Sequence, residues 1–308
     1  MNMRIFSRAF SKIAVCLAVC LLPTPVGLAA DAAPGALTGT LEKARATGQI
    51  TVSYRLANVP FSYLDASFLP TGYAKELCDR VVDSIKQEFA LPQLKTVYLP
   101  VKADDRISAL QKGTIDLECG STSDTPERRE FVDFSLPYFI AHIRLLAPKD
   151  AHIRDLSDLT GKTLAVTRGT TAERVIQEKL KTAHLDIKLA QGKTHSDSFL
   201  MVESGRAAAY ATDDVLLAGL IANSRHTDAY EMVGPPLSSE SYAMMMRKGD
   251  APLKAVVNRT LTRLMLSGEA SKLHNRWFMT PIPPSGIIIN LPMSAELHQI
   301  FTHPEGKH

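Results

Sequence analysis

Apolar and polar positions alternate along this chain in two patterns, one with the period of a helix and one with that of a strand. Between Tyr73 and Phe89, apolar residues fall at positions 74, 77, 78, 81, 82, 85 and 89, which is the spacing of an amphipathic helix. The short run from Ile50 to Tyr54, which follows Gly48, is typical of a strand. Because such segments take turns along the whole sequence, we expect an α/β protein. The expected helices cover residues 41–47, 73–89, 104–112, 172–180, 196–204, 215–223, 252–267 and 295–301, and the expected strands cover 50–54, 96–101, 115–119, 144–147, 163–167, 186–189, 207–211 and 244–247.

The first thirty residues have the layout of a secretory signal peptide. Three basic residues precede an apolar run at 13–22, and small residues at 27–30 lie near the expected cleavage point. An uncleaved anchor is one alternative, but the run is shorter than the roughly 20 residues that a spanning helix needs. A lipoprotein site at Cys20 is another, but the bulky Val19 stands where such a site has a small residue. We therefore expect residues 1–30 to be removed and the mature protein to act in the periplasm.

Removal of this segment changes the charge balance. The whole chain has 35 basic and 32 acidic residues and a formal net charge of +3, but three of the basic residues and no acidic residue lie in the first thirty. The expected mature chain is therefore near neutral, with both signs interspersed, so we expect no nucleic-acid partner and no role at a membrane surface. Its roughly 278 residues are enough for one large or two mid-sized domains.

Cys78 and Cys119 are the two cysteines of the expected mature chain, because Cys16 and Cys20 lie in the signal region. In an oxidising compartment such a pair can form one disulfide, which we predict. The alternative is two buried free thiols, which a protein interior accepts readily.

The sequence offers little for catalysis. It contains no Gly-x-Ser-x-Gly motif, no Walker loop and no dinucleotide fingerprint. Its nine histidines are scattered, with no His-x-x-x-His or Cys-x-x-Cys pair. We therefore expect no catalytic residue, no metal site, no cofactor and no enzymatic activity.

Three polar turns lie between an expected strand and an expected helix, which is where α/β proteins bind their ligands. The first turn combines Ser121, Ser123 and Arg128 with Pro126, which suits the first position of a helix. A helix start attracts a carboxylate, and an arginine can hold one through two parallel hydrogen bonds. An ordinary helix cap beside a solvated arginine is the alternative.

The other two turns are shorter. At the second, Thr170 and Glu173 have the spacing of a capping box, which leaves the hydroxyl and N–H of Thr171 available to an anion, although a plain cap explains the same residues. At the third, Asp213 follows an expected strand. It either pairs with an ammonium group or caps the next helix, a role that Asp214 fills equally well.

Arg55, Arg106 and His195 complete the candidates. Arg55 follows the first expected strand, Arg106 lies inside the helix expected at 104–112, and His195 precedes the helix expected at 196–204. Each taken alone is most simply an exposed or capping residue. Together with the three turns they supply three guanidinium groups, several hydroxyl groups and one acid, a set that suits a ligand with two carboxylates and one ammonium group.

Four sequence patterns resemble those of a known family. The pattern Arg-x-x-x-Val-Asp-Phe-Ser-x-Pro-Tyr covers residues 128–138, and Gly-Ser-Thr, Asp-Ser-Phe and Glu-Ser-Gly-Arg-Ala begin at residues 120, 197 and 203. The first resembles the polar-amino-acid solute-binding proteins of bacterial ABC importers, and the others resemble their glutamate/aspartate-binding branch. The resemblance runs from about residue 41 to residue 301. Further segments that carry it are 59–63, 72–73, 118–122, 127–128, 134–135, 169–171, 213–214, 216–219 and 281–284.

The resemblance implies a role for each matched position. Arg128, Ser123 and Thr171 correspond to residues that hold the α-carboxylate of the amino acid. Ser121 and Asp213 correspond to residues that hold its ammonium group.

Arg55, Arg106 and His195 correspond to residues that face the side-chain carboxylate. The chain departs from the family pattern beside them. Ala103 stands where a serine helps to hold this carboxylate, and Asp104 and Asp105 bring acids close to Arg106. These departures leave the preference between glutamate and aspartate open.

The resemblance also implies the type II periplasmic-binding-protein fold, with two α/β lobes joined by two crossings and the ligand in the cleft between them. Lobe one would combine residues 41–142 with 242–301, and lobe two would cover 143–241. The implied ligands are L-glutamate and L-aspartate, the implied partner is an ABC permease in the inner membrane, and the implied state is a monomer. Buried charges must be paired in such a site, which explains its many arginines and donors.

Other functions fit the same fold. A cyclohexadienyl-dehydratase-like enzyme needs a carboxylic acid in the cleft as general acid, whereas the matched positions here hold arginines, hydroxyls and one aspartate expected to face an ammonium group. A binding protein for another polar amino acid is a second alternative. A sensory domain normally shares its chain with a transmembrane helix and a signalling domain, and we find neither in this sequence.

Overall fold

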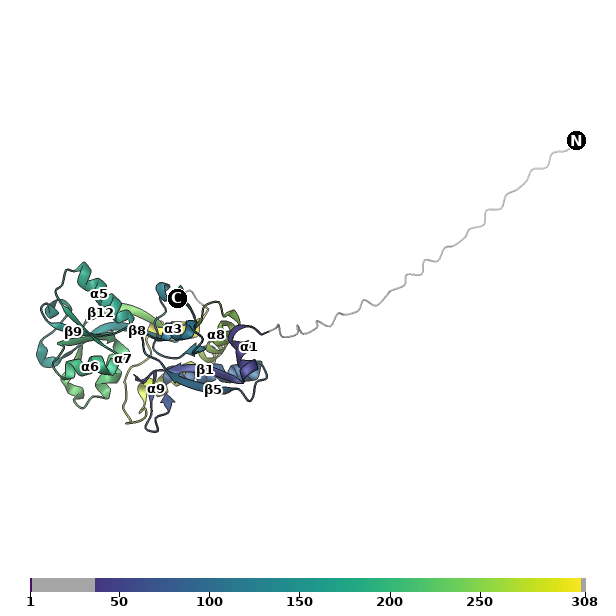
Figure 1. Ribbon diagram of the computed structural model, residues 1–308, viewed down its shortest axis with the longest axis horizontal. Helices are drawn as coiled ribbons and strands as arrows, with labels where there is room; N and C mark the ends of the chain where they lie inside the picture. Colours follow the sequence, from purple (N-terminus) through teal and green to yellow (C-terminus); the bar gives the residue numbers. More distant parts are fainter. Residues whose placement is uncertain (2–36, 306–308) are drawn as a thin grey trace. The chain divides into compact units, whose positions relative to one another are not determined.

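The computed structural model describes Met1 and residues 37–305, in which the strands form two five-stranded sheets and one small three-stranded sheet (Figure 1). Apart from Met1, the signal peptide expected at 1–30 lies outside the described residues. Within residues 37–305, no helix combines the length and the apolar character needed to cross a membrane.

The first sheet joins segments from both ends of the chain. β1 runs parallel to β5 and β6, while β13 runs antiparallel to β6 and β7. The strands expected at 50–54, 96–101 and 244–247 are confirmed to within about a residue, but the one expected at 115–119 is reduced to two residues. In sheet order the strands are β5 (Lys95–Pro100), β1 (Gln49–Tyr54), β6 (Leu117–Glu118), β13 (Met245–Arg247) and β7 (Val132–Phe134).

Helix α2 (Tyr73–Glu88) shows how the apolar spacing works. Its buried residues include Leu77, Cys78, Val81 and Ile85, so the predicted apolar face is the face that packs into the core. Helix α9, which the sequence did not predict, starts after a glycine with φ of 76° and buries a tryptophan and a phenylalanine. The helices packed around this sheet are α1 (Gly39–Thr47), α2, α3 (Arg106–Gln111), α4 (Pro126–Arg129), α8 (Ala251–Leu266), α9 (Glu269–Met279) and α10 (Ala295–Thr302).

In the second sheet β9 pairs in parallel with β10 and β11, while β8 pairs antiparallel with β11 and β12. β11 begins where Ala209 pairs with Leu164, so it lies two residues later than the strand expected at 207–211 and carries Asp213 as its last residue. In sheet order the strands are β10 (Lys188–Gly192), β9 (Thr163–Thr167), β11 (Ala209–Asp213), β8 (Phe139–Pro148) and β12 (Tyr230–Tyr242). The helices are α5 (Thr171–Thr182), α6 (His195–Glu203) and α7 (Asp214–Ala222), with short 3-10 turns at Lys149–Ala151, Ser157–Leu159 and Thr227–Ala229. Figure 1 shows α5 and α6 beside β9.

Strands β8 and β12 pass from one hydrophobic core to the other. Phe139, at the start of β8, and Tyr242, at the end of β12, pair with each other and pack in the core of the first sheet. Leu145 and Val233 pair farther along and pack in a core of the second sheet. The pairing is irregular between Val233 and Ser238. The two strands thus form the two crossings of a two-lobed protein.

An aromatic cluster secures the first sheet beside these crossings. The ring of Phe61 lies 4.9 Å from that of Phe139 and 5.2 Å from that of Tyr242, measured between centroids. The same ring lies 5.7 Å from that of Phe278 on α9. Phe61 belongs to the turn of the small sheet, which consists of β2 (Ala57–Asn58), β3 (Ser62–Leu64) and β4 (Pro70–Thr71). Edge-to-face packing of this kind fixes the small sheet against the crossings.

Candidate functional site

The segment after β6 carries three of the predicted residues, Ser121, Ser123 and Arg128. Helix α4 begins at Pro126, as predicted, and the hydroxyl of Thr125 accepts a hydrogen bond from the N–H of Arg128 at 3.3 Å. The helix has only four residues, so its dipole is small. The positive charge of this turn therefore comes from the guanidinium of Arg128.

Arg128 is half-buried and its side chain is held by the backbone. One terminal nitrogen donates to the carbonyl of Ser123 at 2.8 Å, and the other donates to the carbonyl of Gly169 at 3.3 Å. Gly169 lies between β9 and α5, so this arginine links segments of the two sheets. The pKa of Arg128 is lowered to about 9, mainly by burial and next by the nearby charge of Arg106.

Ser121 is buried and held by a residue that the sequence did not single out. The side-chain amide of Asn58 donates to the hydroxyl oxygen of Ser121 at 2.8 Å. The hydroxyl of Tyr138 donates to the carbonyl of Gly120, the residue that precedes Ser121. The turn after β6 is therefore fixed from two sides, by the small sheet and by the aromatic cluster.

Thr171 is buried as the first residue of α5, and its hydroxyl oxygen lies 3.2 Å from that of Ser123. The hydroxyl of Thr170 accepts a hydrogen bond from the N–H of Glu173 at 3.2 Å, as the predicted cap requires. The carboxylate of Glu173 accepts from the N–H of Gly169 at 2.8 Å, not from that of Thr170. The predicted capping box is therefore only half formed.

Two glycines allow the segments of the two sheets to approach closely. A Cβ on Gly169 would lie 2.7 Å from the Cα of Asp104, just before α3. A Cβ on Gly219, in α7, would lie 2.5 Å from the carbonyl oxygen of Val59. No side chain fits at either point without a shift of the backbone.

Arg55 and Arg106 are both buried, which corrects the reading of either as an exposed arginine. The backbone N–H of Arg55 donates to the hydroxyl of Ser62 at 2.9 Å. Burial lowers the pKa of Arg55 to about 10, and Arg106 is the next largest cause, so the two guanidinium groups are close enough to repel each other. Burial likewise lowers the pKa of Arg106, which is the first residue of α3 and not an interior one.

His195 is buried and begins α6, which corrects the expectation that it precedes the helix. The cap is Thr194, whose hydroxyl accepts from the N–H of Asp197 while the carboxylate of Asp197 accepts from the N–H of Thr194. The Nδ1 atom of His195 lies 2.6 Å from the hydroxyl oxygen of Tyr210. Burial lowers the pKa of His195 to about 3, helped by Arg55 and Arg106, so its imidazole is neutral and can still donate one hydrogen bond.

Asp213 is the buried last residue of β11, while Asp214 opens α7. One carboxylate oxygen of Asp214 accepts from the N–H groups of His142 at 3.1 Å and Val215 at 2.7 Å. The Oδ1 atom of Asp213 has no hydrogen-bond partner among the described residues. The pKa of Asp213 is raised to about 7, mainly by burial and next by the nearby charge of Glu240. Of the two readings of Asp213, the structure therefore favours the free acid over the cap.

Buried polar atoms without a partner gather around these residues. A buried donor or acceptor left unpaired costs about 1–3 kcal/mol, so a cluster of them is expected where a polar ligand supplies the missing bonds. Among the described residues, such atoms include Nη1 of Arg55, Nε of Arg106, both carboxylate oxygens of Glu118, Oδ1 of Asp213 and the hydroxyl oxygens of Ser53, Thr122, Thr212 and Tyr242.

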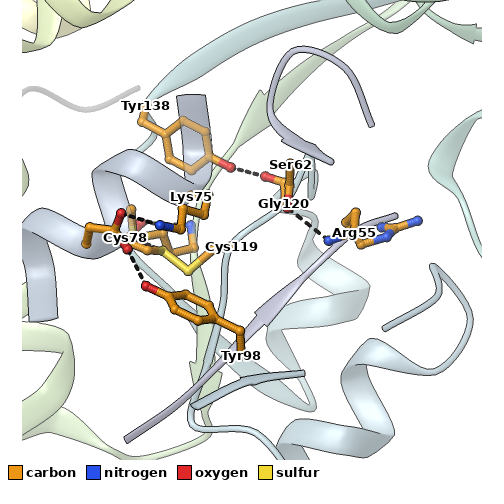
Figure 2. Close-up of a disulfide and its surroundings, with 11 residues drawn as sticks. Arg55, Ser62, Lys75, Cys78, Tyr98, Cys119, Gly120 and Tyr138 are labelled. Carbon is orange, nitrogen blue, oxygen red and sulfur yellow. Dashed lines mark hydrogen bonds and ion pairs between the residues drawn. A yellow bond between two sulfur atoms is a disulfide. The ribbon is translucent and has the colours of Figure 1, made fainter. Parts of the chain in front are cut away.

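The structure joins Cys78 and Cys119 through a disulfide, with their Cα atoms 6.3 Å apart. Figure 2 shows the bridge between α2 and the end of β6, with Gly120 and Arg55 close by. The bridge therefore fixes the strand end from which the turn with Ser121 starts.

A cavity of about 480 Å³ borders the site. It is lined by parts of the small sheet, α6, α7 and residues 283–287, and His195 is the only predicted residue in its wall. Of the other seven, Ser123 contacts Thr171, and the charge of Arg106 lowers the pKa of Arg55 and Arg128.

Glu118, Asn58 and Tyr210 are site residues that the sequence did not predict. Glu118 is buried, like most of the predicted residues, and neither of its carboxylate oxygens has a partner among the described residues. Its one signal was its place in the 118–122 segment that resembles the family. Asn58 and Tyr210 lie in ordinary strand patterns, and nothing in the local sequence marks them.

Comparison with known proteins identifies the family of this chain. Residues 50–280 match the bacterial extracellular solute-binding proteins, family 3. The chain is 42% identical over 295 residues to the L-glutamate/L-aspartate-binding protein of Pseudomonas aeruginosa, a match that covers 94% of this chain and 98% of that one. It is 38% identical over 291 residues to the glutamate/aspartate import solute-binding protein of Escherichia coli, with 94% and 96% covered.

Solved structures of amino-acid-binding proteins have the same fold. A mutant of ArgBP from T. maritima superposes with a TM-score of 0.70 at 26% identity, covering 78% of this chain and 99% of that one. The ancestral amino-acid-binding protein AncCDT-1, a precursor of cyclohexadienyl dehydratase, superposes with a TM-score of 0.67 at 29% identity, again covering 78% and 99%.

Proposed function

Because the chain belongs to family 3 of the bacterial extracellular solute-binding proteins, we propose that its site captures L-glutamate or L-aspartate. The relatives at 42% and 38% identity are named for these two amino acids and for their import, and they are binding proteins, not enzymes. The proposal assigns this chain the same ligand class.

One observation carries the proposal: two buried arginines, a half-buried third and an unpaired acid lie close together. Arg106 lowers the pKa of both Arg55 and Arg128. Asp213, which has a free carboxylate oxygen, raises the pKa of Arg106 and Arg128. A ligand with two carboxylates and one ammonium group has charges opposite in sign to the arginines and to Asp213. Such a ligand would satisfy buried groups that otherwise cost stability.

Each end of the ligand is assigned to its own set of residues. We propose that Arg128, with the hydroxyls of Ser123 and Thr171, holds the α-carboxylate, because these groups contact one another. Asp213 and Ser121 hold the ammonium group. The distal carboxylate is assigned to the remaining buried donors, Arg55, Arg106 and His195.

Closure of two lobes over the ligand fits the contacts between segments. We propose lobe one as residues 41–142 and 242–301 and lobe two as 143–241. The bonds from Arg128 to Gly169 and between Ser123 and Thr171 then cross from one lobe to the other beside the ligand. Ligand enclosed in this way is shielded from water, which strengthens its ion pairs.

The partner and the compartment follow from the family. We infer that the mature protein works as a monomer in the periplasm and delivers its ligand to an ABC permease of the inner membrane. The nearly balanced charge of the expected mature chain and the disulfide between Cys78 and Cys119 are consistent with export.

Calorimetry on ligand-free mature protein tests the proposal. The twenty amino acids are titrated one by one, and L-glutamate or L-aspartate is expected to bind with one site per chain. The melting temperature should rise with the concentration of that ligand, as mass action requires. Prephenate and arogenate serve as controls for turnover. Absence of binding to both acidic amino acids, or conversion of a control substrate, would contradict the proposal.

A further inference from the structure

Glu118 is a buried acid in the site that no role above uses. It is the last residue of β6, its side chain is fully buried, and both of its carboxylate oxygens lack a hydrogen-bond partner among the described residues. A carboxylate is expensive to bury without partners, so its position needs an explanation beyond folding.

The local geometry places this carboxylate and the side chain of Arg55 both close to Gly120. A Cβ on Gly120 would lie 2.6 Å from Oε1 of Glu118 and 3.0 Å from Cγ of Arg55. The absence of a side chain at Gly120 therefore leaves room for both groups side by side. The carboxylate accepts no hydrogen bond from the guanidinium of Arg55.

The charge of Glu118 acts on all three arginines of the site. It raises the pKa of Arg55, Arg106 and Arg128, in opposition to burial, which lowers all three. Glu240, which also raises the pKa of Arg128, differs because the hydroxyl of Ser238 donates to it at 2.7 Å. Glu118 is thus an unpaired negative charge shared among the groups that are assigned to the ligand.

We propose that Glu118 sets the charge selectivity of the site, so that an amino-acid anion with an ammonium group is preferred to a dicarboxylate that lacks one. The inference rests on the proposed function and adds to it a selectivity against dianions. Each carboxylate of a ligand is repelled by Glu118, and an ammonium group is attracted. Glutarate, with two negative charges, is therefore penalised more than L-glutamate, and L-glutamate more than L-glutamine.

The test is Glu118→Gln, which keeps the size of the side chain and removes its charge. Calorimetry with glutarate, L-glutamate and L-glutamine should show changes graded by ligand charge. We expect the ratio of the association constants of glutarate and L-glutamate to rise about tenfold relative to the unmodified protein, and the ratio of L-glutamate to L-glutamine to rise about as much. A merely structural role would change all three constants by the same factor and would overturn the proposal.

Asp116→Asn provides the matched control. It also removes a buried acid, two residues earlier on the same segment, but outside the site. It should leave both ratios unchanged, and Glu118→Asp, which keeps the charge, should leave them within about threefold. A shift of the ratios in Asp116→Asn as large as in Glu118→Gln would overturn the assignment to Glu118.

A measurement on the unmodified protein covers the case in which Glu118→Gln does not fold. On that protein, calorimetry should find that glutarate binds at least about tenfold more weakly than L-glutamate, and equal or tighter binding of glutarate would overturn the proposal. Failure of the proposed function is distinguishable, because it is read from the unmodified protein, which would then bind neither L-glutamate nor L-aspartate.

Discussion

Asp116 and Glu118 are buried acids two residues apart, and their surroundings are opposite. One oxygen of Asp116 accepts from Lys43 at 2.9 Å and from Arg247 at 3.3 Å, and the other accepts from the N–H of Thr51 at 2.9 Å. Glu118 makes none of these bonds, although three arginines lie near it. The cluster around Asp116 is complete within the protein and ties α1, β1 and β13 together. The cluster around Glu118 is incomplete, which is the property of a site that a ligand completes.

The largest expected effect is on stability, in the complete cluster. Asp116→Ala leaves the charges of Lys43 and Arg247 without their partner, and it should lower the free energy of unfolding by about 4 kcal/mol. Denaturant unfolding measures the loss. The folded variant should bind L-glutamate as the unmodified protein does. A large change in affinity would show that Asp116 also contributes to ligand binding.

Arg128→Ala should show the reverse pattern, with lost affinity and nearly unchanged stability. Removal of one partner of a buried charge pair costs about 3 kcal/mol of binding, and every amino-acid ligand should suffer alike, because all have an α-carboxylate. Arg129→Ala is the matched control, because Arg129 is exposed and pairs with Asp124. Calorimetry should find its affinity unchanged. Equal losses in the two variants would mean that Arg128 has no special role.

The disulfide should contribute mainly to stability. The bridge closes 41 residues of chain, and the double variant Cys78→Ala, Cys119→Ala should lose about 3 kcal/mol in the free energy of unfolding. The bridge itself is checked by thiol titration of denatured, unreduced protein. Two reactive thiols in that titration would refute it.

Arg106→Ala should lose less, and selectively. We expect about 2 kcal/mol of weaker binding for glutamate and aspartate, with a smaller loss for glutamine and asparagine, whose amides need no countercharge. All four ligands are compared by calorimetry. Equal losses for acids and amides would mean that Arg55 and His195 hold the distal carboxylate and that Arg106 does not.

The smallest expected effect is on the pH dependence of binding. Without ligand the pKa of Asp213 is raised to about 7, so the group gains a proton as the pH falls through 7. A neutral carboxyl cannot pair with an ammonium group, and affinity for L-glutamate should therefore fall about tenfold between pH 8 and pH 6. Asp213→Asn should bind weakly at every pH, without this slope. If the affinity of the unmodified protein did not change with pH, Asp213 would not be the partner of the ammonium group.

Local patterns predicted the parts of the fold that depend on local physics. The apolar spacing of α2 and the proline at the start of α4 describe features that a segment carries by itself. Strand β12 escaped prediction because Gly234, Pro235 and Pro236 in its middle read as a turn, and the structure accommodates them as an irregularity in the ladder. Its pairing with β8 is a long-range property.

The chemistry of the site was predictable through the family resemblance more than through single residues. Arg55 and Arg106 are ordinary surface residues by local sequence, and only the tertiary fold buries them. Glu118 was missed because only the tertiary fold buries its carboxylate, in the space that Gly120 leaves open. Charged residues that come together from distant segments produce no periodic pattern in the sequence, so local analysis does not group them into one site.

The two carbonyls that hold Arg128 have a consequence for entropy. An arginine side chain gives up about 2 kcal/mol of rotamer freedom when it is fixed in one geometry. The carbonyl of Ser123, on the same segment, holds this guanidinium, and the carbonyl of Gly169 adds a second bond when the lobes close. That entropic cost therefore falls on the folding and closing of the protein, and a carboxylate meets a donor that is already oriented.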